Sequence, residues 1–258
     1  MVKIKRIIFW IITILSFILV ALYLTSFSLG FRYNPNTHKW QKTGSFLIRC
    51  DPQDVKIYLN GRLLSTRCPK IERFLLPGNY DLKITKNGYY TWQKNIEVES
   101  GKVTRAENIL LFLANIILSL SDETINYPTT TPPALALLPP SYNAKHLTFG
   151  YKDIIYQNGT IFYSDNAELR GRDLKGEKDF LITRFSKPIN KFTLTKDTNH
   201  FFVVVEDKII VCDKDGSNVI ELITLPQKEY SKINITLDNQ EDKLFLELDG
   251  KNYFAQIH

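Results

Sequence analysis

The pattern of hydrophobic and polar positions changes sharply after the first thirty residues of the chain. From Ile7 to Phe31 no residue is charged, and isoleucine, leucine, valine and phenylalanine dominate the run. A helix that crosses the hydrocarbon layer needs about 20 apolar residues, because only a helix satisfies its own backbone polar groups in lipid. The pattern therefore predicts an uncleaved membrane-spanning helix over residues 7–27.

Two other interpretations of this apolar run remain open. A cleaved signal peptide has a shorter apolar core, of about 7–15 residues, followed by a small-x-small cleavage site. Residues 25–30 offer only a poor site of that kind. A core helix of a soluble protein is the third interpretation, and the length of the run makes it the least favoured.

The charges that flank the apolar run bear on its orientation. Basic residues precede it at Lys3, Lys5 and Arg6, and others follow it at Arg32, Lys39 and Lys42. The tail of residues 1–6 adjoins the run directly, where the preference of basic residues for the cytoplasm acts best. We therefore expect a cytoplasmic N-terminus and extracytoplasmic C-terminal domains, although the charge difference is small.

Residues 28–43 form a polar stalk by this reading, and a β pattern begins at Gly44. Apolar and polar residues alternate over 46–50, 55–59 and 80–84, as expected for strands with one buried and one wet face. Further strands are predicted over 89–92, 96–98 and 103–112. Turn signals such as Asn60-Gly61 and Asn87-Gly88 separate them. About six short strands in roughly 70 residues are typical of a small antiparallel β-sandwich.

The order of turns and strands over residues 44–112 carries a family resemblance. Its elements are Cys50-Asp51-Pro52, Lys56-Ile57-Tyr58-Leu59-Asn60-Gly61, Cys68-Pro69, Leu76-Pro77-Gly78-Asn79-Tyr80, Lys86-Asn87-Gly88-Tyr89 and Ile96-Glu97-Val98-Glu99-Ser100-Gly101. This region resembles a PEGA domain, a β-sandwich module named for a Pro-Glu-Gly-Ala signature, of which only Pro52 is kept. The resemblance covers about a quarter of the chain. It implies an extracytoplasmic, non-catalytic module of surface and envelope proteins.

Residues 113–140 are predicted to connect this sandwich to a second domain. The apolar run 109–120 is too short to span a membrane unaided. We expect it to finish the sandwich and to pack between the domains; a membrane-surface or re-entrant element is the alternative. Residues 121–140 hold five of the 11 prolines and read as an extended linker.

Residues 141–258 again show a β pattern, with three hairpins. They centre on Asn158-Gly159, Glu206-Asp207 and Asp249-Gly250, and they recur at intervals of about 47 and 43 residues. A period of 40–50 residues is typical of propeller blades. A closed propeller needs more blades than this region can supply, so a degenerate repeat, an open ring or a different β-sheet remain open. The predicted fold is therefore mainly β: a transmembrane helix, a small antiparallel β-sandwich, then a β-rich domain of propeller-like hairpin repeats.

Composition narrows the class of protein but supplies no activity. The chain is 44% hydrophobic and 23% charged, which excludes a disordered chain. Its net charge is +6, but residues 31–258 hold 30 basic and 27 acidic residues. A nucleic-acid-binding surface needs a clustered basic face, so we expect no nucleic-acid partner.

Residues with reactive or ligating side chains form no recognisable catalytic or metal-binding motif. The four histidines are not spaced with other ligands as in a metal site. The segment Asp213–Asn218 superficially resembles a calcium loop, but Gly216 falls at its fourth position rather than its sixth. We interpret it as a turn between strands and expect no catalytic residue, no metal and no cofactor.

Two small groups of residues are nevertheless candidates for a defined role. Cys50 and Cys68 both fall in the predicted sandwich, near loop ends that the fold could bring together. A disulfide there would be worth about 3 kcal/mol in the chain-entropy model; two reduced, buried cysteines are the alternative. Tyr89, Tyr90 and Trp92 could form a binding patch for glycans or could belong to a core.

These observations favour a single-pass, membrane-anchored cell-envelope protein. Its partners would be the lipid bilayer, through residues 7–27, and envelope proteins or wall polysaccharide. We expect a non-catalytic scaffolding or interaction role. The main alternative is a module that binds wall polysaccharide or peptide, and an enzyme with an unrecognised site is a lesser one.

Overall fold

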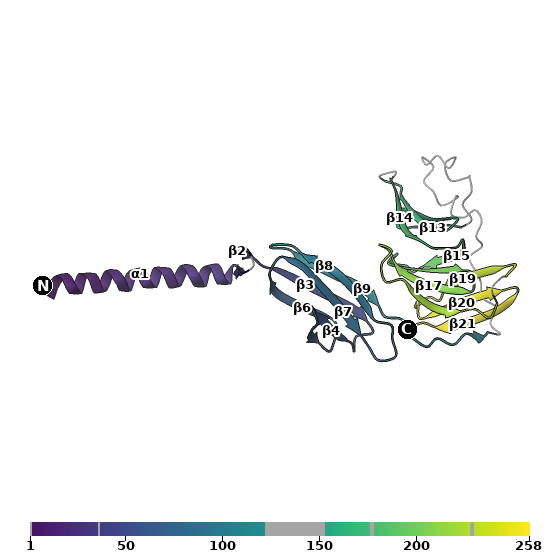
Figure 1. The fold of residues 1–258 in the computed structure, drawn as a ribbon, viewed down its shortest axis with the longest axis horizontal. Coiled ribbons are helices and arrows are strands. Elements are labelled where there is room, and N and C mark those ends of the chain that lie inside the picture. The colour runs from purple at the N-terminus through teal and green to yellow at the C-terminus, as the bar shows by residue number, and fades with distance from the viewer. Residues whose placement is uncertain (1, 36, 122–152, 176–177, 228–229) are drawn as a thin grey trace. The chain divides into compact units, whose positions relative to one another are not determined.

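The computed structural model describes residues 2–35, 37–121, 153–175, 178–227 and 230–258 (Figure 1). The chain is mainly β and divides into two compact units. The first unit comprises residues 1–84 and 95–109, and the second comprises residues 85–94 and 110–258. The chain therefore passes from one unit to the other three times.

The first unit begins with a long apolar helix, α1 (Val2–Ser28). Within Arg6–Ser28, an 18-residue window has a mean hydropathy of 2.8, and none of that window is buried against the protein. By length and composition this helix can cross a membrane, over a range that includes the predicted span 7–27. Gly30, at a φ of 85°, follows the helix in the left-handed conformation that glycine adopts readily.

A short hairpin follows the helix, within the residues that the sequence predicts as a polar stalk. Strands β1 (Phe31–Asn34) and β2 (Lys39–Lys42) pair antiparallel as a two-stranded sheet. The hairpin is tied to the helix end because Thr43 donates its backbone N–H and its hydroxyl to the Gly30 carbonyl, both at 2.8 Å. The predicted stalk is thus an ordered element.

Seven strands, which lie in the first unit except for a few residues at the ends of β7, β8 and β9, form two sheets. They are β3 (Gly44–Asp51), β4 (Lys56–Leu59), β5 (Arg62–Ser65), β6 (Lys70–Leu75), β7 (Gly78–Thr85), β8 (Trp92–Val98) and β9 (Val103–Leu110). The strand orders are β6-β3-β9 and β5-β4-β7-β8. The alternating apolar residues form the core, with Phe46, Ile48, Ile57 and Leu82 fully buried.

The sandwich differs from the sequence prediction in two places. Strands β5 and β6 lie in a region where the alternation is weak, because most of their side chains are exposed or half-buried. The two short strands predicted over 89–92 and 96–98 are one strand, β8, which is preceded by a loop.

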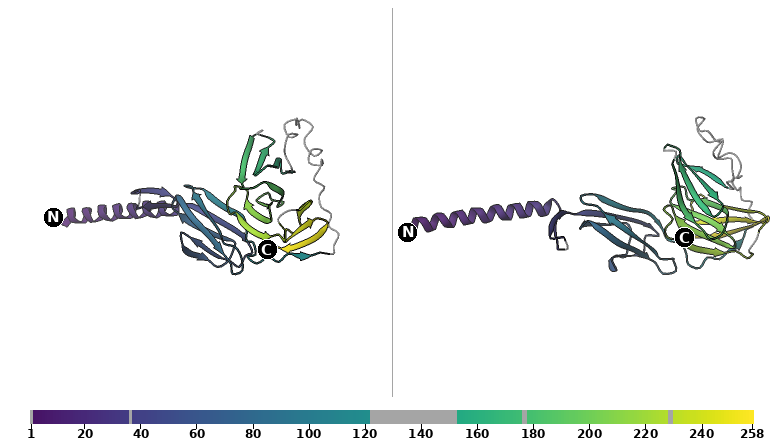
Figure 2. Two further views of the ribbon diagram at one scale, coloured as in Figure 1. Left: turned by 45° about the vertical axis from the view of Figure 1, so that its right-hand side comes forward. Right: turned by 45° about the horizontal axis from the view of Figure 1, so that its top comes forward.

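The described residues of the second unit form three four-stranded antiparallel sheets (Figure 2). The first sheet consists of β11 (Ile154–Gln157), β12 (Thr160–Asp165), β13 (Glu168–Asp173) and β14 (Lys178–Arg184). The second consists of β15 (Ile189–Leu194), β16 (His200–Val205), β17 (Lys208–Asp213) and β18 (Ile220–Thr224). The third consists of β19 (Ile233–Leu237), β20 (Lys243–Leu248), β21 (Lys251–Gln256) and β10 (Ser119–Leu120).

The first two sheets are meanders of consecutive strands, as in propeller blades, and the third is a meander over β19–β21. Strand β15 of the second sheet lies against β12 of the first and β19 of the third. The outermost strand of the third sheet is distant from the others in sequence. It is β10, which pairs with β21 through Ser119↔Phe254 and Leu120↔Tyr253. A strand from the start of the unit therefore completes its last sheet.

The three predicted hairpins are present, but they are not equivalent. The first is β11–β12, at the edge of its sheet, whereas the others, β16–β17 and β20–β21, are the central pairs of theirs. The equivalent central strands begin at Thr160, His200 and Lys243, 40 and 43 residues apart. The blade repeat is thus more regular than the hairpin intervals suggest.

The predicted connection 113–140 is described only up to residue 121. The apolar run 109–120 ends β9, contributes the buried residues Leu111 and Phe112, and then forms β10. The predicted linker from residue 122 onward, and residues 141–152 of the predicted last domain, lie outside the described residues.

Candidate functional site

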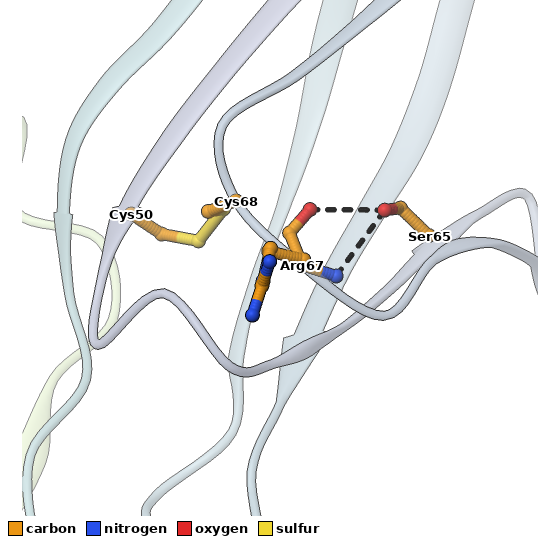
Figure 3. The surroundings of a disulfide bond; sticks show 4 residues. All are labelled: Cys50, Ser65, Arg67 and Cys68. Atoms are coloured by element: carbon orange, nitrogen blue, oxygen red, sulfur yellow. Dashed lines mark hydrogen bonds between the residues drawn. A yellow bond between two sulfur atoms is a disulfide. The ribbon is translucent and has the colours of Figure 1, made fainter.

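Cys50 and Cys68 are joined as a disulfide in the sandwich (Figure 3). Cys50 lies near the end of β3 and Cys68 just before β6, and their Cα atoms are 5.8 Å apart. The backbone pairing of β3 with β6 extends to Ile48 and Lys70. Cys50 and Cys68 lie two residues beyond that pair, so the disulfide is on the same face of the sheet. Beside it, Ser65 closes a turn by donating to the Arg67 carbonyl at 2.9 Å. The sulfur bridge therefore fixes a strand pair where the backbone pairing stops.

The predicted aromatic residues lie in the segment 85–94, which belongs to the second unit and is called the aromatic loop here. Trp92 is only 6% exposed, and its indole Nε1 donates to Asp213 Oδ2 at 3.2 Å. Tyr90 packs against the buried cluster formed by the second and third sheets, and its hydroxyl donates to the Glu221 carbonyl at 3.0 Å. These two rings are thus used in packing, as the core interpretation of the sequence expects.

Tyr89 is half-buried and has a different neighbourhood. It forms an isolated bridge with Leu113, and the Lys86 ammonium lies 5.0 Å from its ring centroid. The three aromatic residues do not form one exposed platform, because Trp92 is buried. The surface-patch interpretation therefore does not hold for the three residues as a set.

Asp213, at the end of β17, receives hydrogen bonds from several segments of the second unit. Besides Trp92, the Asn218 side-chain amide donates to its Oδ2 at 2.8 Å, and the Ser217 hydroxyl does so at 3.4 Å. His200 Nε2 lies 3.6 Å from its other oxygen. We call these five residues, Trp92, His200, Asp213, Ser217 and Asn218, the Asp213 cluster.

Two ionisable groups in this region, His200 and Cys212, have pKa values shifted by burial. Burial lowers the pKa of His200, although the neighbouring carboxylates of Asp213 and Asp197 act in the opposite direction. Burial also raises the pKa of the Cys212 thiol to about 12, so this cysteine is protonated and a poor nucleophile at neutral pH.

The turn Asp213–Asn218 is held together by its own side chains. Asp215 Oδ1 accepts from the Ser217 hydroxyl at 2.6 Å, and its carboxylate also pairs with Lys94 of the aromatic loop. Burial alone would raise the pKa of Asp215, but the hydrogen bonds from Lys94 and Ser217 lower it overall. Protein donors therefore occupy the carboxylates that superficially resemble calcium ligands.

Strand β18 is the outermost strand of the second sheet, and the aromatic loop contacts it. Tyr90 donates to the Glu221 carbonyl, and the Asn218 side chain just before the strand accepts from the Gln93 backbone N–H at 3.3 Å. A groove of about 480 Å³ is lined by Tyr90 and residues 219–224. Uncovered edge strands tend to pair with other chains, so the loop protects part of this edge.

No three His, Cys, Asp or Glu side chains converge as metal ligands within the part of the chain that the structure describes. Sequence reasoning identified Trp92 and the turn at Asp213 separately, but it did not connect them. They are 121 residues apart, and no local pattern signals a pairing at that distance.

Comparison with known proteins finds one family match, over the first β unit. The model of the PEGA domain family matches residues 43–110. No curated protein sequence matches the chain. Solved structures that match the chain at a low level include a gluconolactonase from Xanthomonas campestris, with 10% identity, a TM-score of 0.36 and coverage of 88% of this chain and 64% of that one.

Two other solved structures are similar at the same low level. Hsv2 from Kluyveromyces lactis has 12% identity and a TM-score of 0.34, covering 80% of this chain and 71% of its own. A quinoprotein alcohol dehydrogenase-like protein from Bacteroides thetaiotaomicron has 14% identity and a TM-score of 0.28, covering 81% and 55%. This chain spans less than two thirds of the gluconolactonase, and at these scores the likeness says nothing about activity.

Proposed function

We propose that this chain, which carries a PEGA domain over residues 43–110, is a single-pass membrane-anchored protein of the cell envelope. Its two β units would lie outside the cytoplasm in a non-catalytic scaffolding or interaction role. The observation that carries the proposal is helix α1, whose apolar stretch Arg6–Ser28 finds no cover in the protein. Lipid is the solvent that suits such a surface.

The disulfide supports the extracytoplasmic position of the units. Disulfides persist in oxidising compartments and are rare in the cytosol. The Cys50–Cys68 bridge lies in the PEGA domain, the module whose resemblance implies an envelope protein. Both arguments agree with the basic tail before α1, which favours a cytoplasmic N-terminus.

The contacts of the second unit support an interaction role over the alternatives. Trp92 and Tyr90 are engaged by Asp213 and Glu221, so they are poorly suited to stack on a sugar ring. This weakens the wall-polysaccharide alternative, whose named residues were these aromatics. The enzyme alternative has no support from Cys212, whose thiol is buried and protonated.

Protease shaving of cells tests the proposed topology. An epitope is placed after His258, and intact cells are treated with protease before and after removal of the wall. The proposal expects loss of the epitope in at least the wall-stripped cells. Survival of the epitope in both samples until lysis would contradict it.

Cosedimentation with purified wall material separates the interaction role from the wall-binding alternative. The detergent-solubilised full chain is mixed with the material and centrifuged, together with a Tyr89→Ala variant. The proposal expects the chain to stay in the supernatant. Pelleting that Tyr89→Ala abolishes would favour the alternative instead.

A further inference from the structure

The hairpin β1–β2 presents aromatic side chains that no other strand covers. Tyr33 and Trp40 are directly opposite each other, their ring centroids are 6.0 Å apart, and they are 48% and 55% exposed. The hairpin is a sheet of two four-residue strands. A two-stranded hairpin is marginally stable in water unless its apolar face packs on something. The aromatic pair therefore needs a further surface.

The hairpin lies beside the last turns of helix α1. The Trp40 and Tyr23 ring centroids are 6.4 Å apart in an edge-to-face arrangement. Tyr23 precedes the helix end by five residues, or about 7.5 Å along the axis at 1.5 Å per residue. If α1 spans a bilayer, Trp40 then lies near the depth at which the helix leaves it. Tryptophan and tyrosine favour this interfacial zone, since their rings are apolar and carry one polar group.

Basic groups accompany the aromatic pair without any acidic residue in the same stretch. No Asp or Glu precedes Asp51 in the sequence. The side chains of Lys39 and Lys42 are exposed. The Arg32 guanidinium donates to the Phe27 carbonyl at 2.9 Å and lies over the rings of Phe27 and Phe74, at 3.4 and 4.7 Å. This arrangement of rings and cations is complementary to acidic lipid headgroups above an acyl layer.

We propose that the hairpin Phe31–Lys42 is a second membrane-binding element, which binds acidic phospholipid headgroups of the leaflet where α1 ends. Trp40 and Tyr33 lie at the boundary between headgroups and acyl chains, and Lys39 and Lys42 contact phosphates. The inference rests on the proposed membrane anchor and adds a lipid class to it. It also gives the ordered hairpin within the predicted stalk a role.

Lipid-dependent fluorescence quenching tests this proposal on the full chain. The protein is reconstituted in nanodiscs of phosphatidylcholine, with or without added phosphatidylglycerol, and with acyl chains brominated near the headgroup. Trp40 emission is the difference between a Trp10→Phe variant and a Trp10→Phe/Trp40→Phe variant, so Trp92 cancels. The proposal expects loss of most Trp40 emission to brominated lipid, and a larger loss with phosphatidylglycerol.

Charge variants test the headgroup contact. Lys39→Gln/Lys42→Gln should abolish the additional quenching with phosphatidylglycerol, whereas the control Lys56→Gln/Lys178→Gln, at two other exposed lysines, should retain it. Trp40 emission that is quenched by aqueous acrylamide and not by brominated lipid would overturn the proposal. So would equal quenching in both lipids. A protein that alkaline carbonate extracts from the bilayer would instead refute the anchor itself.

Discussion

Asp213 links the aromatic loop to the second sheet of the second unit. Its carboxylate accepts hydrogen bonds from the buried indole of Trp92 and from the side-chain amide of Asn218. Replacing Trp92 by Phe keeps an apolar ring and removes the donor to Asp213, together with part of the buried indole surface. Losing a buried hydrogen bond that involves a charged group costs about 1.5–3 kcal/mol. We expect Trp92→Phe to lower the free energy of unfolding of the second unit by at least that amount, because the smaller ring also packs less well; circular dichroism of the detergent-solubilised chain measures it.

Tyr90→Phe is the matched control for this substitution. It also removes one hydrogen bond of the aromatic loop, but the Tyr90 hydroxyl bonds to a backbone carbonyl at an exposed position. Water can replace that bond, so the expected loss is about 0.5 kcal/mol or less. Equal losses for the two variants would mean that Asp213 does not hold the loop.

His200 makes the stability of the second unit depend on pH. Burial is the main cause of its lowered pKa; Asp213, Asp197 and Glu241 oppose the shift, and His258 adds to it. A histidine whose pKa is lower in the folded than in the unfolded state is stabilising when neutral. Its contribution is complete above the unfolded value of 6.5 and is lost as the pH falls from there towards the folded pKa.

Unfolding measurements at several pH values check this prediction. The free energy of unfolding should fall between about pH 7 and pH 5, where histidine changes its charge. His200→Gln should remove much of that fall, while His38→Gln, at an exposed position, should leave it unchanged. A His200→Gln variant with the full pH dependence would contradict the assignment.

At the scale of elements, the β17–β18 turn depends on a glycine. Gly216 has a φ of 75°, and a Cβ there would lie 2.0 Å from the Ile182 carbonyl oxygen of β14. Gly250, in the β20–β21 turn, has a φ of 82° and no atom within 4 Å of such a Cβ. Gly216→Ala must therefore displace backbone. Gly250→Ala loses only the stability that the left-handed conformation costs a residue with a Cβ, roughly 1 kcal/mol.

Thermal unfolding of these two variants compares the turns directly. We expect Gly216→Ala to lower the melting temperature of the second unit clearly more than Gly250→Ala does. A Gly216→Ala variant that melts with or above the Gly250→Ala variant would show that β14 does not pack against this turn as described.

The strand pair β3–β6 is the element that the disulfide stabilises. A bridge across 18 positions is worth about 3 kcal/mol in the chain-entropy model. Thiol titration of the denatured, unreduced protein should detect one thiol, that of Cys212, and three after reduction. Reduction should also destabilise the first unit by about 3 kcal/mol. Three thiols before reduction would disprove the bridge.

Local signals in the sequence identified most of these elements. The Asn-Gly and Asp-Gly turns, with positive φ at Asn60, Asn158 and Asp249, mark hairpins that the structure contains. Alternation identified β3, β4 and β7 because each has one buried face. These patterns involve only a few neighbouring residues, so they can be recognised from the sequence without a structure.

Other features depend on distant or external partners and left no local signal. Strand β10 has two residues and exists because β21 offers it an edge. The hairpin β1–β2 lacks a buried face within the protein, so its residues read as polar stalk. Of the candidate residues, the cysteine pair could be proposed from position alone, whereas the role of Trp92 required knowing where Asp213 lies.

At the scale of the whole molecule, the chain joins an apolar helix, a disulfide-bonded PEGA domain and a unit whose described residues form three blade-like sheets. The exposed apolar surface of α1, the Cys50–Cys68 bridge and the PEGA domain each support the proposed place in the cell envelope. None of them specifies a partner. The central proposal is therefore one of topology, with the N-terminus in the cytoplasm and both units outside it.

Labelling with a membrane-impermeant maleimide tests that claim most directly, because the native cysteines are either bridged or buried. One variant carries Lys251→Cys, at an exposed position of β21, and its control carries Lys3→Cys in the N-terminal tail. The account predicts that intact cells label the Lys251→Cys variant and leave the Lys3→Cys variant unlabelled until lysis. Labelling of the Lys3→Cys variant alone in intact cells would reverse the topology and contradict the account.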